Sequence, residues 1–161
     1  MIGYFLALTT EKIDELNRDP AGLSAFLESA IEDQEELGAD FLDIDKSWHG
    51  IHFLLTGSVR EGEPPHAWVV CPPTEIGEDL GDGPARLLSP DQVVEVSKAL
   101  TQITGDKLKK KCDFALMNDS AIYPQGWRTG DQDYIAENFI QLRKFYESAA
   151  KRHMGVVHWL G

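Results

Sequence analysis

Both ends of the chain are apolar and have the residue types of β-strands. Residues 2–8 read IGYFLAL, and residues 156–160 read VVHWL. Short apolar runs with aromatic and β-branched side chains are typical of buried strands. The backbone N–H and C=O groups of a buried strand need hydrogen-bond partners. The economical solution is that the two ends pair with each other in one small sheet, and this requirement restricts the fold more than any other feature of the sequence.

The segments between the two ends are predicted to be mainly helical. The clearest 3.6-residue period lies in 132–152. A second clear helix follows Ser89, which is a good N-cap residue, and has Pro90 at its first position. The other predicted elements are a short helix between Thr10 and Pro20, helices at 23–37, 45–56 and 106–117, strands at 66–70 and 85–89, and a mobile surface loop at 77–83.

Strands and helices do not alternate along this chain, so the predicted fold class is α+β. We expect a single small sheet that includes both terminal strands, with several helices packed against one face. The length of 161 residues suits one domain spanning 1–161. Hydrophobic residues make up 42% of the chain, which is enough for a core without disulfides.

Several classes of protein are disfavoured by simple features. No apolar stretch approaches the roughly 20 residues of a membrane helix, and the start of the chain does not resemble a signal peptide. The two cysteines have no metal-binding spacing, and free thiols in a reducing cytoplasm are expected. There is no P-loop and no G-x-G-x-x-G, so no cofactor is predicted.

The charge is strongly negative and unevenly distributed. The formal net charge is −12; residues 1–83 hold 18 acidic and four basic side chains, whereas residues 84–161 hold nine and 11. A negative surface repels phosphate, so nucleic acid is an unfavourable partner, and a basic protein is a favourable one. Glu28, Glu32 and Glu35 are the candidate contact residues on the acidic helix. The alternative is that the charge only keeps the protein soluble.

The segment 43–57, DIDKSWHGIHFLLTG, holds the densest group of polar side chains that could act in chemistry. With Asp45 as N-cap and Gly57 after the last turn, Trp48 falls on the core face at 100° per residue. His52 then lies at the border of that face, and His49 lies beyond it within reach of Asp45. The H-x-x-H spacing does not match a helical zinc site, so no metal is predicted. A histidine beside a carboxylate is a usable base, but no G-x-S-x-G nucleophile motif is present.

This segment resembles the signature of the YfbM-like family of small bacterial proteins, a domain of unknown function. The start MIGYF, the mid-chain GPARLLSPDQV and the later IYPQGW also fit that family. The resemblance spans nearly the whole chain and implies a bacterial, cytosolic, single-domain α+β protein. It implies no catalytic role. The positions that match are Asp43, Asp45, Lys46, Trp48, His52, Thr56, Gly57, Tyr123, Pro124 and Trp127.

Two functions follow from these observations. The first is an interaction module whose acidic surface docks on a basic partner, for example an immunity-type inhibitor of a basic toxin. The second is a small-ligand binder or enzyme with an aromatic pocket around Trp48, His52 and Trp127. The candidate ligand-binding residues are Asp45, Trp48, His49, His52, Arg86, Tyr123 and Trp127. The interaction module is the favoured function, and on the sequence alone a protein without enzymatic activity is favoured over an enzyme. The sequence does not determine the oligomeric state.

Overall fold

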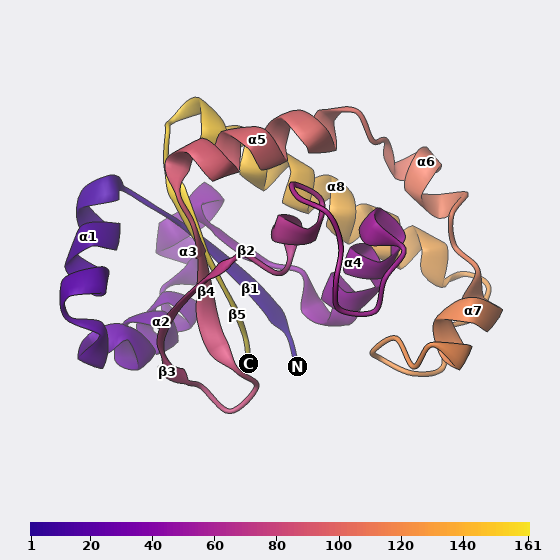
Figure 1. The fold of residues 1–161 in the computed structure, drawn as a ribbon, viewed down its shortest axis with the longest axis horizontal. Coiled ribbons are helices and arrows are strands. Elements are labelled where there is room, and N and C mark those ends of the chain that lie inside the picture. Colours follow the sequence, from indigo (N-terminus) through magenta and orange to yellow (C-terminus); the bar gives the residue numbers. More distant parts are fainter.

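A computed structural model describes all residues, 1–161, and contains one five-stranded antiparallel sheet. The strand order is β2-β1-β5-β4-β3. The bounds are β1 Gly3–Leu8, β2 Phe41–Asp43, β3 Thr74–Asp79, β4 Pro84–Leu88 and β5 Gly155–Leu160. Eight α-helices surround this sheet (Figure 1), so the predicted α+β class is confirmed.

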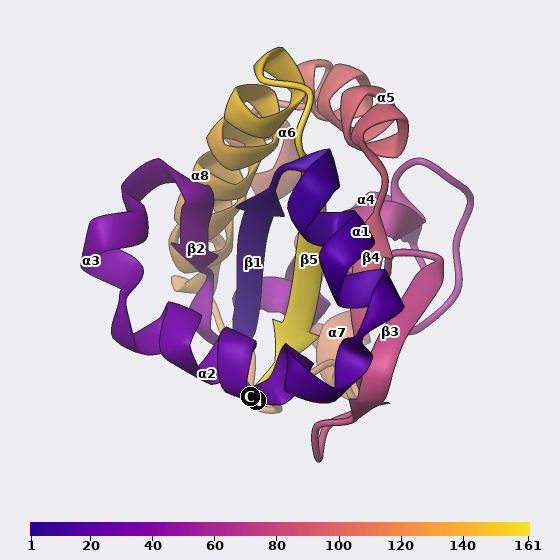
Figure 2. The ribbon, with the colours of Figure 1, turned by 90° about the vertical axis from the view of Figure 1, so that its left-hand side faces the viewer.

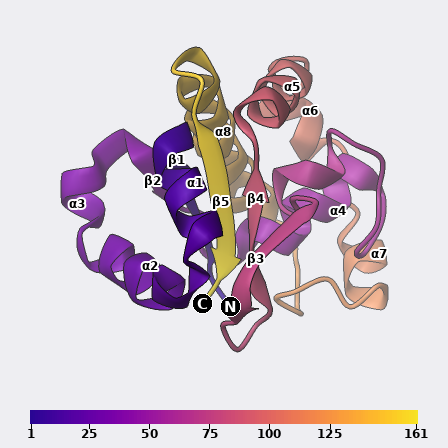
Figure 3. The same ribbon diagram turned by 60° about the vertical axis from the view of Figure 1, so that its left-hand side comes forward.

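The two terminal strands pair with each other, as predicted. β1 and β5 run antiparallel along their whole lengths, from Gly3 opposite Leu160 to Leu8 opposite Gly155. Ile2 and Gly161 exchange two further backbone hydrogen bonds of 2.6 and 3.1 Å. The two ends of the chain therefore lie side by side at one edge of the molecule (Figure 3).

Helices cover both faces of the sheet, whereas one covered face was expected. α1 (Thr10–Arg18), α2 (Leu23–Glu32) and the short α3 (Gln34–Leu37) lie on one side (Figure 2). The opposite side carries α4 (Trp48–Thr56), α5 (Pro90–Thr101), α6 (Gly105–Lys109), α7 (Phe114–Asp119) and α8 (Asp131–Lys151). Coverage on both sides explains why β1 and β5 are almost entirely apolar, since a half-exposed strand would alternate.

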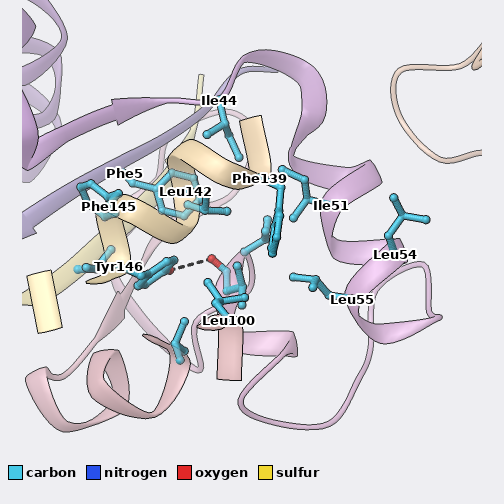
Figure 4. Close-up of a cluster of buried hydrophobic side chains, with 14 of the residues drawn as sticks. Phe5, Ile44, Ile51, Leu54, Leu55, Leu100, Phe139, Leu142, Phe145 and Tyr146 are labelled. Carbon is cyan, nitrogen blue, oxygen red and sulfur yellow. Dashed lines mark hydrogen bonds between the residues drawn. The ribbon is translucent and has the colours of Figure 1, made fainter. Parts of the chain in front are cut away.

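Each face has its own hydrophobic core. In β1, Phe5 and Ala7 belong to the larger cluster under α4, α5 and α8, while Leu6 and Leu8 belong to the smaller cluster under α1 and α2. Figure 4 shows the larger cluster around Phe139 and Leu142 of α8. The hydroxyl of Tyr146 donates to the carbonyl of Val69 across 2.8 Å inside it. The predicted apolar stripe of α8 is confirmed, because Ile135, Phe139, Leu142, Tyr146 and Ala149 are all buried.

The predicted start of the helix after Ser89 is confirmed, because capping by side chains fixes where α5 (Pro90–Thr101) begins. Ser89 accepts a hydrogen bond from the N–H of Gln92, and the Gln92 side chain accepts one from the N–H of Ser89. This capping box, followed by Pro90, fixes the first turn of α5.

Two predicted helices are each divided in the structure. The segment 23–37 changes direction at Asp33, whose carboxylate accepts from the Ser29 hydroxyl at 3.1 Å. The segment 106–117 is interrupted before Asp113, which caps α7 by accepting from the N–H of Leu116 at 3.0 Å. The Asp113 side chain bonds to the backbone that follows it, which competes with a continuous helix and explains the second break.

Two further segments differ from the sequence-based predictions. Residues 66–70 contain a turn of 3-10 helix, Ala67–Val69, because Ala67, Val69 and Val70 all face the core, which an alternating strand does not allow. Residues 77–83 are a hairpin end and not a free loop. The Asp79 carboxylate accepts from the N–H groups of Gly81 and Gly83 and orders the turn between β3 and β4. No helix of the chain has the length and apolarity needed to cross a membrane.

Candidate functional site

The segment 43–57 folds as a 3-10 turn, Asp45–Ser47, followed by α4. Gly57 ends α4 in the left-handed conformation with φ 73°, as expected for a residue in this place. Asp45 is not the N-cap that the sequence suggested. It has φ 49° and lies inside the 3-10 turn, where its carboxylate makes no bond to the helix. The prediction of a mainly helical segment is confirmed, but its first turn is a 3-10 helix, which is wound more tightly than an α-helix.

His49 is held at both ring nitrogens by backbone groups. Nδ1 accepts from the N–H of Tyr123 at 3.0 Å, and Nε2 lies 2.8 Å from the carbonyl of Val59. A backbone N–H only donates and a carbonyl only accepts, so the ring is the neutral tautomer with its proton on Nε2. Burial lowers the pKa of His49, and the nearby Arg60 lowers it further. In this arrangement His49 joins three segments and has no nitrogen left for a ligand.

Trp48 lies in an aromatic stack at the surface and not in the core. Its ring is stacked on His49 with a centroid distance of 4.9 Å and an interplanar angle of 8°, and Tyr123 lies 5.8 Å away. Its indole N–H donates to the carbonyl of Met1 at 3.4 Å. The prediction of a buried Trp48 is therefore wrong, because the stack and the first residue cover it only in part.

His52 was expected at the wet edge of α4, and that expectation is wrong. The side chain is 1% exposed, because the chain after α4 folds back over it. Nε2 donates to the carbonyl of Glu61 at 3.2 Å, and Nδ1 is buried without a partner. Burial lowers the pKa of His52, so the ring stays neutral.

Asp45 bonds to Tyr134 of α8 and not to His49. The Tyr134 hydroxyl donates to the Asp45 carboxylate at 2.9 Å and accepts from the N–H of Lys46 at 3.1 Å. Asp43 accepts from the N–H of Asp45 at 2.6 Å. Burial, followed by the Asp45 carboxylate, raises the pKa of Tyr134. This group fixes the unusual backbone of Asp45 against α8.

Trp127 is 5% exposed and belongs to the larger core. Its indole N–H donates to the carbonyl of Ile122 at 3.0 Å. A Cβ added at Gly50 would come within 3.3 Å of the Trp127 ring, so α4 packs closely on it. Trp127 lines a shallow hollow of about 160 Å³ beside Tyr134 and Lys46. None of the five main cavities has both His52 and Trp127 in its wall.

Arg86 lies away from Tyr123 and Trp127, on β4, where it is paired in register with His158 of β5. Its guanidinium donates to the carbonyl of Pro72 at 3.1 Å and to Glu75 at 2.5 Å. A cavity of about 120 Å³ is lined by Arg86, His158, Cys71 and Trp48. The structure thus brings two of the predicted residues, Trp48 and Arg86, to one cavity.

Sequence reasoning missed His158 and Cys71 as members of this cavity. One signal was present: His158 is the single polar residue inside the terminal run VVHWL. A histidine in an otherwise apolar strand must be buried together with its neighbours. No group of three or more His, Cys, Asp or Glu side chains is arranged so that it could hold a metal ion.

The candidate protein-binding residues Glu28, Glu32 and Glu35 are all exposed. Glu28 accepts from the Ser24 hydroxyl at 3.3 Å. Ser24 in turn lines the largest of the five main cavities, a groove of about 650 Å³ between the start of α2 and the end of β3. Glu32 lies one turn further along α2, and Glu35 lies beyond the break at Asp33.

Comparison with known proteins gives a family and a fold. A sequence model of the protein family described as "Domain of unknown function (DUF1877)" matches residues 1–159. The crystal structure of YfbM from Escherichia coli, a protein of unknown function, is similar with a TM-score of 0.73 and 22% sequence identity. The match covers 98% of this chain and 98% of that one. No curated protein matches the sequence.

Proposed function

This chain belongs to the protein family described as a domain of unknown function, DUF1877, and we propose that it is a protein-binding module. The partner segment that it holds is basic and partly apolar. The observation that carries the proposal is the groove between the α1–α2 connection and β3, since its lining combines apolar residues with carboxylates that are in no salt bridge. An immunity-type inhibitor of a basic toxin is one concrete form of such a module.

The groove brings together two acidic segments that are distant in sequence. One wall is Asp19–Ser24, which contains the 3-10 turn Pro20–Gly22, and the other is Gly77–Leu80 at the end of β3. Gly77 has φ 74°, and a Cβ there would meet the Leu23 side chain at 2.6 Å. The Gly77 backbone therefore packs directly on the Leu23 side chain, and this contact joins the two walls.

The charge of the groove has one sign. Asp19, Glu78 and Asp79 lie in its wall, and no lysine, arginine or histidine does. None of these three carboxylates is in a salt bridge with a basic side chain. Pro20, Ala21 and Leu80 supply apolar surface between them. A segment with Lys or Arg next to a leucine-like side chain complements this pattern, and charge complementarity would speed its docking.

Addition of a strand to the sheet edge is a less suitable mode of binding. β3 is an edge strand, but its pairing with β4 shifts between Ile76 and Asp79. Bulges at an edge protect it from pairing with a further strand. The side-chain groove, and not the backbone of β3, is therefore the docking feature.

The test is a titration of the ¹⁵N-labelled full chain with a peptide of Lys and Arg residues interspersed with Leu. We expect amide shifts concentrated in 19–24 and 77–80, with an affinity that falls as salt screens the charges over about 8 Å at physiological ionic strength. Asp19→Asn with Glu78→Gln should weaken binding by about two- to fivefold per charge. Asp79 is left intact because it orders the β3–β4 turn.

The matched control is Glu95→Gln with Asp119→Asn, which changes the net charge equally. Both residues are exposed, and they lie on α5 and α7 across the sheet from the groove. Reversal of Glu28, Glu32 and Glu35 to Lys should slow association more than it speeds dissociation, because charges at a rim act mainly on encounter. Equal weakening by the groove pair and the control pair would overturn the proposal.

A further inference from the structure

A second cavity, of about 120 Å³, lies on the opposite face of the sheet from the groove. Its wall includes Arg86 of β4, His158 of β5, Trp48 at the start of α4, and Cys71. Arg86 and His158 are register partners, so their side chains emerge next to each other on the same face. Asp82 and Gly83, from the β3–β4 turn, complete the wall from the solvent side.

His158 is the buried polar group of this cavity. It is 4% exposed, and its Nε2 has no hydrogen-bond partner in the protein. The Phe5 ring lies against the imidazole at a centroid distance of 4.5 Å. Burial, with the Arg86 charge, lowers the pKa of His158 to about 3, so the ring is neutral and carries one N–H and one free acceptor. Buried polar atoms almost always have a partner, and His158 lies in the wall of this cavity.

Arg86 lies in the same wall, and its positive charge is paired with the Glu75 carboxylate at 2.5 Å. A guanidinium has five N–H groups. The hydrogen bonds to Pro72 and Glu75 use two of them, and three remain. Arginine presents its donors in a planar fork that suits a carboxylate. The inner part of the cavity therefore offers donors from Arg86 and the ring of His158.

The solvent side of the cavity has the opposite charge. Asp82 is exposed and lies in the wall. A simple anion would be repelled there, whereas the N–H groups of Arg86 that are not used by Pro72 and Glu75 favour an acceptor such as a carboxylate. A molecule with a carboxylate at one end and an ammonium at the other meets both charges favourably.

We propose that this cavity binds a small zwitterionic amino acid, with its carboxylate on Arg86 and His158 and its ammonium group near Asp82. Liquid water occupies about 30 Å³ per molecule, so the cavity has the room of about four waters. That room suits glycine or alanine and excludes an amino acid with a large side chain. The site is separate from the groove, and its existence does not depend on the protein-binding function.

The test uses glycine as the probe, with acetate and methylammonium as single-charge controls and phenylalanine as the size control. Ring signals of His158 in ¹H–¹⁵N spectra of the full chain report whether Nε2 gains a partner. We expect millimolar glycine to shift these signals, acetate to act more weakly, and methylammonium and phenylalanine to have no effect. Glycine should also slow alkylation of Cys71, which lines the cavity, but not that of Cys112, which does not.

Two variants separate binding from folding. His158→Phe should abolish the protection of Cys71 by glycine while raising the Tm, because it removes an unpaired buried nitrogen. Arg86→Gln should raise the Kd for glycine about tenfold or more, since it removes a hydrogen bond to a charged group. His52→Phe is the matched control: His52 also has an unpaired buried ring nitrogen but lines none of the five main cavities.

Three results would overturn the proposal. Unchanged His158 signals with every probe would show that the cavity holds water only. If methylammonium shifted the His158 signals as strongly as glycine, Arg86 would not be binding a carboxylate. Protection of Cys71 by glycine that persists in His158→Phe would place the binding elsewhere.

Discussion

The N–H of Tyr123 donates to Nδ1 of His49 across 3.0 Å and so joins two segments that lie 74 positions apart in the chain. These are the two segments that carry most of the family resemblance, 43–57 and 123–127. His49 also bonds to the carbonyl of Val59, so one neutral ring connects α4, the loop after it and the loop before α8. The polar character of this region is largely accounted for by such structural bonds.

His49→Phe should destabilise the protein although it preserves the stack on Trp48. The substitution leaves the N–H of Tyr123 and the carbonyl of Val59 unpaired, at a cost of about 2 kcal/mol in the free energy of unfolding. Urea unfolding followed by circular dichroism measures the difference. A variant as stable as the wild type would show that these two bonds are readily replaced by water.

Tyr134→Phe should destabilise the protein by about 1–2 kcal/mol, because Asp45 and the N–H of Lys46 both lose the hydroxyl. Asp45→Asn should be nearly neutral, since asparagine accepts from Tyr134 and tolerates a positive φ. Asp45→Val should cost more than either, because a β-branched residue is strained at φ 49°. Thermal melts of the three variants give this order, and an equal effect of Asn and Val would contradict it.

Stability should fall as the pH drops below about 6.5, the ordinary value for histidine. Burial lowers the pKa of His49, His52 and His158 in the folded protein. The unfolded chain therefore binds more protons than the folded one between the lowered and the ordinary pKa, and folding is disfavoured there. Each histidine contributes up to about 1.4 kcal/mol per pH unit in that window.

The variant His158→Phe isolates one part of that dependence. Its unfolding free energy should vary less steeply with pH than that of the wild type between pH 6.5 and the folded-state pKa of His158, which is about 3. Urea titrations at a series of pH values measure both slopes. Identical slopes in the two proteins would show that His158 is protonated in the folded state as readily as in the unfolded chain.

Deletion of residues 156–161 should prevent folding. β5 is the central strand, paired with both β1 and β4, and its Val156 and Val157 are fully buried on opposite faces of the sheet. Removing it separates β1 from β4 and exposes both cores. The measurement is a thermal melt of the truncated chain, and a cooperative transition would contradict the prediction.

Some of the fold follows from local signals. The pairing of the two ends was predictable because apolar strands must satisfy their backbone groups inside the protein. The buried stripe of α8 follows from its 3.6-residue period, and the start of α5 follows from Ser89 and Pro90. These features depend on residues that are neighbours in sequence or on a requirement that any fold must meet.

The environment of the polar side chains and the position of the two cavities depend on contacts between segments that are distant in sequence. His52 is buried because 58–61 folds back over α4, and Asp45 turns to Tyr134 because α8 lies beside it. The groove exists because the connection before α2 approaches β3, and the second cavity exists because the sheet places Arg86 opposite His158. Angular placement on a single helix contains no information about such neighbours, since the burial of a side chain depends on every segment that packs around it. The sequence alone determined the sheet of joined ends and the acidic first half; the tertiary structure decided which polar side chains hold the fold together and which remain free to bind.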